Sequence, residues 1–340
     1  MRKPDFDNIL AVLANTKPER PTLFEFAINK PQRFFGSHRN VVDEDDPLAV
    51  FRALIYVFHR LGYDYVPIPS WETNTLSFPT SGFTQKDTRS LNEGANIFDK
   101  KSLRSYPFPD PDAGDYSIFQ TLSKELPDGM KFICNGNGGI LENAINLVGY
   151  ENLCIMLFED ENLVQKIFDA IGSRYVRYYE ICARIDCIGA CISNDDWGFK
   201  TQTILSPAML RKYVFPWQRK IVEVVHKAGK PAILHSCGNL EKVMDDVIDD
   251  MKFDAKHSFE DSIVPVEQAY ERWGDRIAIL GGIDIDYLCS RSPEEIYERS
   301  HTMILKTKNR GGYALGSGNS IPEYVPAENY QAMLSAAVED

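Results

Sequence analysis

Two residue types that bind metals lie close together in the segment His235-Ser236-Cys237. The segment follows the apolar run Pro231-Ala232-Ile233-Leu234, which has the character of a buried parallel strand. Side chains two positions apart on an extended chain point to the same side, so an imidazole and a thiolate here could bind one zinc ion. The competing interpretation is a chance pair in which the cysteine is a small buried apolar residue. The position at a strand end favours a metal site, because active sites of α/β proteins lie at the carboxyl ends of their strands.

Short apolar runs alternate with helical patterns along the rest of the chain. Eight candidate strands cover residues 22–28, 63–69, 131–134, 187–193, 231–235, 253–257, 277–283 and 312–316. Helical patterns cover 47–61, 162–185, 207–228, 240–250 and 292–309, and Ser206 and Ser292, each followed by proline, are expected to begin two of them. This order predicts a (β/α)8 TIM-type barrel whose active site lies at the C-terminal ends of the strands. A doubly wound open sheet is the alternative.

The length of 340 residues is compatible with one barrel domain covering 1–340. An irregular, proline-containing insertion at about 70–114 interrupts the alternation. We expect it either to cover the mouth of the active site or to be a surface excursion without function.

The amino-acid composition limits which partners the protein could bind and in which compartment it could lie. The net charge of −12 argues against nucleic acid and anionic membranes as partners, although a local arginine cluster could still hold an anionic substrate. No apolar stretch approaches the roughly 18 residues of a membrane span. The chain has seven cysteines and does not open with a secretory signal pattern, which predicts a cytoplasmic protein with reduced thiols.

Several segments after residue 187 resemble the uroporphyrinogen decarboxylase superfamily in their order and spacing. They are Asp195-Asp196-Trp197-Gly198, Ile204-Leu205-Ser206-Pro207, Phe215-Pro216, His235-Ser236-Cys237-Gly238-Asn239, Gly274-Asp275-Arg276-Ile277, Gly281-Gly282-Ile283-Asp284 and residues 311–322. The resemblance covers about half of the chain and implies a (β/α)8 barrel. The His-x-Cys-Gly-Asn segment is closest to the cobalamin-dependent methyltransferase branch, which includes the methylcobalamin:coenzyme M type.

That branch implies zinc bound by an H-x-C…C pattern, with His235 and Cys237 as the first two ligands. The last cysteine of the pattern is missing, because the C-terminal loop reads Gly316-Ser317-Gly318-Asn319. Ser317 takes its place and is a poor zinc ligand. Four other candidates for the third ligand are side chains at predicted strand ends, namely Glu25, Asp195, Asp196 and His257. Cys191 is a further possibility.

Some of these residues have a second interpretation. Asp195 and Asp196 could be catalytic acids, or they could only satisfy the dipole of a helix start. His257 could be a structural histidine. Asn319 and Ser320 could hydrogen-bond a bound cofactor or substrate, although their segment is also ordinary turn chemistry.

Two further segments add weaker expectations. Gly136-Asn137-Gly138-Gly139 is similar to an anion-cradling loop at a helix start, and it lacks the P-loop pattern. Asp64 occupies the place that the resemblance gives to the catalytic aspartate of uroporphyrinogen decarboxylase.

Three functions follow as hypotheses. The first, implied by the resemblance, is zinc-dependent methyl transfer between a corrinoid (cobalamin) presented by a partner protein and a small thiol, methoxy or methylamine compound. The second is decarboxylation of uroporphyrinogen, which is disfavoured because Phe24-Glu25-Phe26-Ala27 stands where that enzyme has an arginine pair for substrate carboxylates. The third is a non-catalytic barrel that binds a corrinoid or another ligand.

Overall fold

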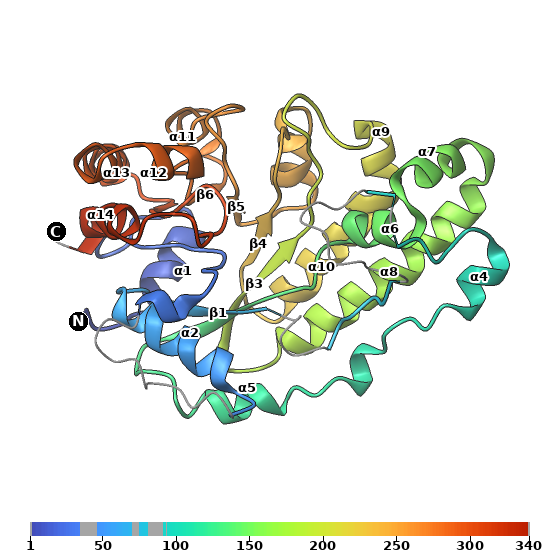
Figure 1. Ribbon diagram of the computed structural model, residues 1–340, viewed down its shortest axis with the longest axis horizontal. Coiled ribbons are helices and arrows are strands. Elements are labelled where there is room, and N and C mark those ends of the chain that lie inside the picture. The colour runs from blue at the N-terminus through green and yellow to red at the C-terminus, as the bar shows by residue number, and fades with distance from the viewer. Residues whose placement is uncertain (1, 35–45, 70–74, 81–90, 93, 339–340) are drawn as a thin grey trace.

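A curved sheet of seven parallel strands organises the molecule, in the order β1-β2-β3-β4-β5-β6-β7 (Figure 1). The computed structural model describes residues 2–34, 46–69, 75–80, 91–92 and 94–338. The strands are β1 (Tyr65–Pro69), β2 (Lys131–Asn135), β3 (Ile188–Asn194), β4 (Ala232–His235), β5 (Ala255–His257), β6 (Ala278–Leu280) and β7 (Tyr313–Ala314). Each strand pairs with the next one along the chain, so the sequence alternation is confirmed for seven of the eight predicted strands.

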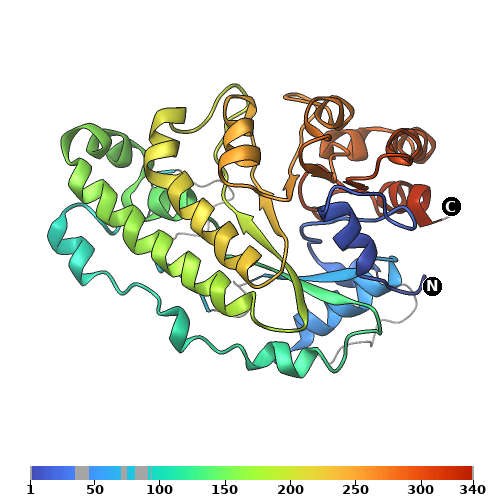
Figure 2. The same ribbon diagram turned by 180° about the vertical axis from the view of Figure 1, so that it is seen from behind.

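The helices between the strands cover the outer face of the sheet, where α8 and α10 run side by side (Figure 2). In the N-terminal half they are α1 (Asp7–Leu13), α2 (Ala49–Arg60), α4 (Lys100–Ser105), α5 (Ser117–Leu122), α6 (Ile140–Val148), α7 (Tyr150–Glu159) and α8 (Glu161–Cys182). In the C-terminal half they are α9 (Pro207–Met209), α10 (Phe215–Lys227), α11 (Val266–Trp273), α12 (Ile285–Ser290), α13 (Pro293–Thr307) and α14 (Ala327–Val338). Among the described helices, none has both the length and the apolar character that crossing a membrane requires.

The predicted strand at 22–28 is not a regular strand. It makes isolated parallel bridges from Leu23 to Leu315 and from Ile28 to Ile321, beside β7. Between these two places the backbone groups of Gly316 and Gly318 form hydrogen bonds with Ile283. The structure therefore contains a seven-stranded parallel sheet with an eighth segment bridged to its last strand.

Two predicted helices differ in detail. The pattern at 207–228 splits into α9, a π-helical turn at Leu210–Val214 and α10, because Pro216 lacks the backbone N–H of a continuous ladder. The stretch at 240–250 forms a 3-10 turn at Glu241–Val243 and a π-helical turn at Asp246–Asp250 instead of an α-helix. Aspartates are poor helix formers, and at the C-terminal end they oppose the helix dipole. The predicted serine caps are confirmed at Ser206 and Ser292.

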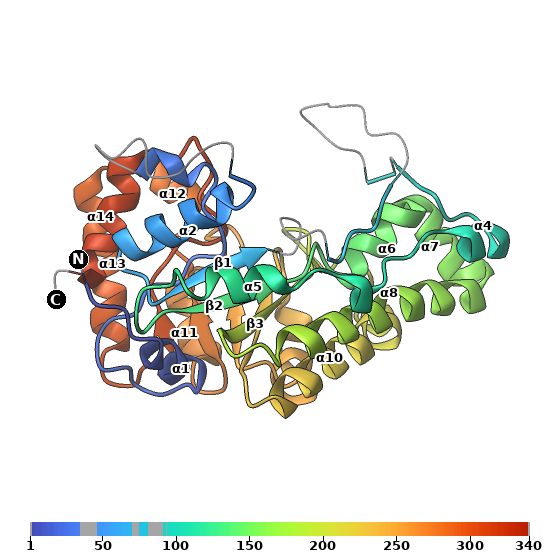
Figure 3. The same cartoon turned by 90° about the horizontal axis from the view of Figure 1, so that it is seen from below.

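The insertion at 70–114 is described in part, since residues 70–74, 81–90 and 93 lie outside the described residues. Its described portion contains α4 and a 3-10 turn at Pro111–Ala113 and runs along α8 (Figure 3). There Arg174 donates to the Pro109 carbonyl, and Arg177 pairs with Asp112.

Helix α8 sets the position of the loops after β2 and β3. Tyr178 and Tyr179 follow Tyr175 by three and four residues, which is the spacing of one buried helix face. The Tyr178 hydroxyl donates to the carbonyl of Asn135, the Tyr179 hydroxyl to Ile192, and the Tyr175 hydroxyl to Asn137. These bonds fix the carboxyl ends of two strands against the outer helix.

Candidate metal centre

His235 and Cys237 come together with Asp196 at the carboxyl end of the sheet. One potential ligand atom from each residue lies within 4.8 Å of those of the other two. His235 is the last residue of β4, Cys237 follows in the next loop, and Asp196 belongs to the loop after β3. Because Asn194 and His235 are paired neighbours in the sheet, the two loops leave it side by side.

A chain of hydrogen bonds determines which nitrogen of His235 can bind a metal. The Nε2 atom of His257 lies 3.2 Å from the Ser317 carbonyl oxygen, which can only accept, so this nitrogen carries the proton. The Nδ1 atom of His257 is then an acceptor, 2.8 Å from Nδ1 of His235. His235 must therefore be protonated at Nδ1, which leaves a lone pair on its Nε2 atom.

The electrostatics of both histidines agree with this assignment. Burial lowers the pKa of His235 well below its ordinary value, and His257 and Lys256 lower it further. The pKa of His257 is also lowered, mainly by burial. Both rings are therefore neutral near pH 7, as a ligand and its supporting residue must be. The Phe26 ring stacks on His235 with 3.9 Å between the ring centroids and covers one side of the imidazole.

Polar groups surround the sulfur of Cys237. The Nδ2 atom of Asn319 donates to Sγ at 3.3 Å, and the backbone N–H of Cys237 donates to Oδ1 of Asp196 at 2.8 Å. Burial raises the pKa of the Cys237 thiol, and the charge of Asp196 raises it further. A nearby cation is thus what would keep this sulfur as a thiolate at neutral pH.

The distances fit a zinc ion. The Sγ atom of Cys237 lies 3.7 Å from Nε2 of His235. Two such ligands on a tetrahedral zinc ion are separated by about 3.6 Å, given Zn–S and Zn–N bonds of about 2.3 and 2.0–2.1 Å. With the carboxylate of Asp196 these residues supply three ligands and leave a fourth position open, as in catalytic zinc sites.

Glycine is required where the two ligand loops meet. Gly238 has φ of +83°, in the region that favours glycine, and a Cβ atom there would overlap the carbonyl of Gly198. The close contact between the loops holds Cys237 next to Asp196. The His-Ser-Cys-Gly order therefore has a structural reason as well as a chemical one.

Asp195 points away from Asp196 and caps a helix. Its buried carboxylate accepts from the backbone N–H groups of Leu141 and Glu142 in the first turn of α6, and from the Gln218 side chain. A Cβ atom at Gly139 would collide with this carboxylate. An anion thus does lie at the helix start that follows the loop at 136–139, but its donors are backbone N–H groups of α6, and the anion is a side chain of the protein itself. This placement does not support Asp195 as a zinc ligand or catalytic acid.

The other candidates for a third ligand lie behind His235 or away from it. Both ring nitrogens of His257 have partners within the hydrogen-bond chain described above. Glu25 is fully buried on the side of its segment opposite Phe24 and Phe26, and it accepts from the Ser317 hydroxyl at 2.5 Å. Neither Glu25 nor Ser317 is available to a metal at Cys237 in this arrangement. Cys191 lies on the outer face, 3.5 Å from the sulfur of Cys134.

The burial of Glu25 predicts a pH dependence of stability. Burial raises the pKa of Glu25 from 4.5 to about 8, against the opposing hydrogen bonds from Ser317. The folded protein therefore binds this proton more tightly than the unfolded chain, and the free energy of unfolding should fall as pH rises between these values. At about 1.4 kcal/mol per pKa unit, the loss is on the order of a few kcal/mol.

The variant Glu25→Gln keeps the shape of the side chain without the titration. Urea unfolding at pH 5 and at pH 8 should show a smaller loss of stability in the variant than in the wild type. Equal losses in the two proteins would contradict the assignment of this pH dependence to Glu25.

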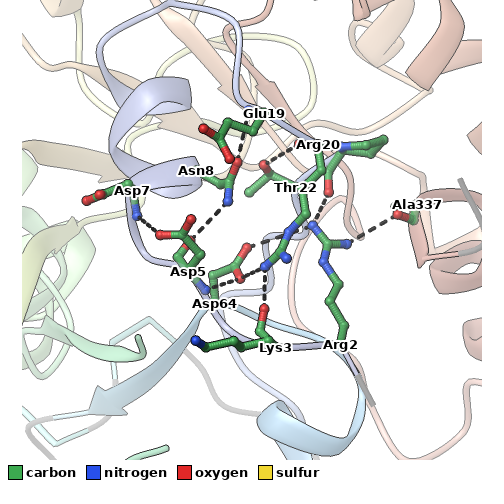
Figure 4. Close-up of polar contacts among 11 residues, drawn as sticks. Arg2, Lys3, Asp5, Asp7, Asn8, Glu19, Arg20, Thr22, Asp64 and Ala337 are labelled. Carbon is green, nitrogen blue, oxygen red and sulfur yellow. Dashed lines mark hydrogen bonds and ion pairs between the residues drawn. The ribbon is translucent and has the colours of Figure 1, made fainter. Parts of the chain in front are cut away.

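Asp64 lies at the other end of the sheet. It precedes β1, so it is at the amino end of a strand whose carboxyl end faces the site. Its carboxylate accepts from Arg20 and from the backbone N–H of Asp5, and Arg2 lies 3.9 Å away (Figure 4). This cluster joins the N-terminal segment to the sheet, and it does not support a catalytic role for Asp64.

Two residues that contact His235 or Cys237 were not singled out in the sequence. Phe26 covers His235, and the Oγ atom of Ser258 lies 3.5 Å from Sγ of Cys237. Ser258 has φ of +97°, a strained conformation that is often found at functional sites. The sequence could have indicated Ser258, because it directly follows the predicted strand end at His257. Ser320 lines a groove together with Asn319, and neither His235 nor Cys237 is among the residues that line this groove.

Comparison with known proteins assigns the family. The model of the uroporphyrinogen decarboxylase (URO-D) family matches residues 92–339, and the chain belongs to this family. A methylated-thiol–coenzyme M methyltransferase of Methanosarcina mazei is 27% identical over 201 residues, which are 58% of this chain and 50% of that protein. A uroporphyrinogen decarboxylase of Synechococcus is 26% identical over 196 residues, 55% of this chain and 51% of that protein. The aligned part thus spans about half the length of these curated relatives.

A solved structure supports the fold. The structure of a methyltransferase from Methanosarcina mazei superposes with a TM-score of 0.71 and 15% sequence identity, over 98% of this chain and 97% of that one. At this identity the likeness concerns the fold alone. The resemblance identified in the sequence is confirmed by the family match.

Proposed function

We propose that this member of the uroporphyrinogen decarboxylase family is a zinc-dependent methyltransferase. It would move a methyl group between a corrinoid held by a partner protein and a small thiol, methoxy or methylamine compound. The observation that carries the proposal is the ligand cluster of Asp196, His235 and Cys237, with 3.7 Å between the last two ligand atoms. The methyltransferase among the curated relatives supports the reaction class.

The residues of the chain would hold the metal and prepare it for a substrate. His235 offers its Nε2 lone pair, Cys237 its sulfur and Asp196 a carboxylate oxygen. A zinc ion bound there would keep a substrate thiol in its thiolate form near neutral pH, and a corrinoid would give or take the methyl group. Asn319 would orient the Cys237 sulfur through its amide hydrogen bond, and Phe26 would keep water from one side of His235.

The charge of the inner face argues against uroporphyrinogen as the substrate. Within the seven strands and residues 22–28, the basic residues are Lys131 and Lys256. Lys131 is at the amino end of β2, and Lys256 lies on the outer face, where its ammonium group donates to the carbonyls of Ser236 and Ser258. The many carboxylates of uroporphyrinogen would find no guanidinium partner on these strands.

We also infer that residues 22–28 complete a (β/α)8 barrel and that residues 1–340 form one domain. The bridges of this segment to the last strand support both inferences.

The test is a methyl-transfer assay under anaerobic and reducing conditions. Zinc-loaded protein is mixed with methylcobalamin and 2-mercaptoethanol, and the absorbance of methylcobalamin is followed. We expect turnover that a chelator removes and added zinc restores. Absence of transfer to or from thiol, methoxy and methylamine compounds, with zinc present, would overturn the proposal.

His257 should act on zinc affinity without binding the metal. In His257→Phe, His235 loses the acceptor that holds its Nδ1 proton, and zinc affinity should fall by about 10–100-fold. In His257→Gln a side-chain oxygen can accept the same proton, so affinity should stay within a few-fold of wild type. Chelator competition measures both. An equal loss in the two variants would mean that the ring is needed only for packing.

A further inference from the structure

Asn135 is a buried side chain whose amide has no partner among the residues that the structure describes. It is the last residue of β2 and is 1% exposed, and neither Nδ2 nor Oδ1 forms a hydrogen bond with them. Buried carboxamides in folded proteins are nearly always paired, because removing them from water without a partner is unfavourable. The amide of Asn135 therefore makes no favourable polar contact with the described part of the chain.

The strand pattern places this amide on the same face as the candidate metal centre. The neighbouring Cys134 points to the outer face, where its sulfur contacts Cys191 beneath α8. Side chains alternate along a strand, so Asn135 faces inward. His235 also faces inward, since its ring stacks on Phe26 and bonds to His257.

The strand register gives the approximate distance between Asn135 and His235. Asn135 pairs with Ile192 on β3, and Asn194, two residues further along, pairs with His235 on β4. With strands about 4.8 Å apart and a rise of about 3.3 Å per residue, the Cα atoms of Asn135 and His235 are separated by on the order of 10 Å. Both side chains project toward the interior of the curved sheet at its carboxyl end.

We propose that Asn135 is the residue that recognises the substrate, by binding a neutral group that both donates and accepts hydrogen bonds. A carboxamide or hydroxyl on the molecule that reacts at Cys237 and His235 would satisfy both amide atoms of Asn135. The reaction of this molecule at the metal rests on the proposed function. The claim that the amide of Asn135 binds a ligand does not depend on it.

The chemistry of the amide defines the ligand class. Oδ1 accepts and Nδ2 donates, so a second carboxamide can form two hydrogen bonds with it. A carboxylate has no donor and would bring negative charge against Oδ1. Lys131 is exposed at the amino end of β2 and Lys256 lies on the outer face, so neither compensates such a charge beside Asn135.

Stability measurements on the full chain separate a ligand-binding amide from a structural one. Asn135→Leu replaces the unpaired amide by an apolar group of similar size, so its unfolding midpoint should equal or exceed that of the wild type. The matched control is Asn143→Leu. Asn143 is also buried, but its Nδ2 atom donates to Asn137, Gly139 and Tyr175, so this variant should unfold at lower temperature. If the midpoint of Asn135→Leu falls as much as that of the control, the proposal is overturned. The same result is expected if an enclosed water already satisfies the amide, so that case is covered too.

Ligand binding is tested on cobalt(II)-loaded protein with two thiols of nearly equal shape, 3-mercaptopropionamide and 3-mercaptopropionate. We expect the ratio of their affinities, amide over carboxylate, to fall about tenfold from wild type to Asn135→Leu. Asn135→Ala serves if the leucine variant does not fold. An unchanged ratio would overturn the proposal. If neither thiol binds the wild type, the metal-centre function fails, and the stability comparison still decides the claim for Asn135.

Discussion

Cys237→Ala is expected to lose zinc and to reduce methyl-transfer turnover by about 10³-fold or more. The sulfur of Cys237 is the only thiolate ligand in the cluster of Asp196, His235 and Cys237. A zinc site reduced to one imidazole and one carboxylate has too few strong ligands to hold the ion at ordinary concentrations. Zinc content and turnover measured on the same preparation test both effects.

The control for this variant is Cys289→Ala. Cys289 is an exposed free thiol on α12, so its loss should leave both zinc content and turnover unchanged. Wild-type zinc content in Cys237→Ala would show that the metal, if present, is held elsewhere. Retained zinc with lost turnover would assign Cys237 to catalysis instead of metal binding.

The second large effect concerns stability. Asp64→Ala should lower the free energy of unfolding by about 3 kcal/mol, because it leaves two partly buried guanidinium groups without their counter-ion. The Asp64 side chain is 1% exposed, and it holds Arg20 and Arg2, whose side chains are 30% and 10% exposed (Figure 4). The same cluster joins the N-terminal segment to α14 through the Ala337 carbonyl.

Denaturant unfolding of Asp64→Ala is compared with that of Asp112→Ala. Asp112 forms an ion pair with Arg177 at the surface, where such pairs contribute about 1 kcal/mol or less. A similarly small loss in both variants would mean that the Asp64 cluster adds little to the fold. Loss of methyl transfer in a folded Asp64→Ala protein would instead revive the catalytic role that the sequence suggested.

Features that depend on local sequence were predictable. The continuous apolar runs predicted the strands. The Ser-Pro pairs at Ser206 and Ser292 predicted helix starts, because a helix cap depends only on residues within one turn. The strand end at His235 predicted where the candidate ligand cluster of Asp196, His235 and Cys237 lies. The family resemblance was carried by segments in the part of the chain that the family model matches.

Features that depend on the direction of a side chain could not be predicted from the sequence. The sequence could not choose between Asp195 and Asp196, since a shift of one residue decides which of them caps α6 and which meets Cys237. Glu25 is directed to Ser317 for the same reason, on the side of its segment opposite Phe26. The unpaired amide of Asn135 became visible only once the described residues around it had been placed.

The most direct test of the metal centre is the zinc content of the protein purified under reducing conditions, combined with X-ray absorption at the zinc edge. The account predicts about one zinc per chain, bound by one sulfur with nitrogen and oxygen as the other ligands. The single sulfur is Cys237, with Asp196 in place of a second cysteine. Absence of zinc after reconstitution, or a zinc ion bound by two sulfurs of the protein, would contradict it.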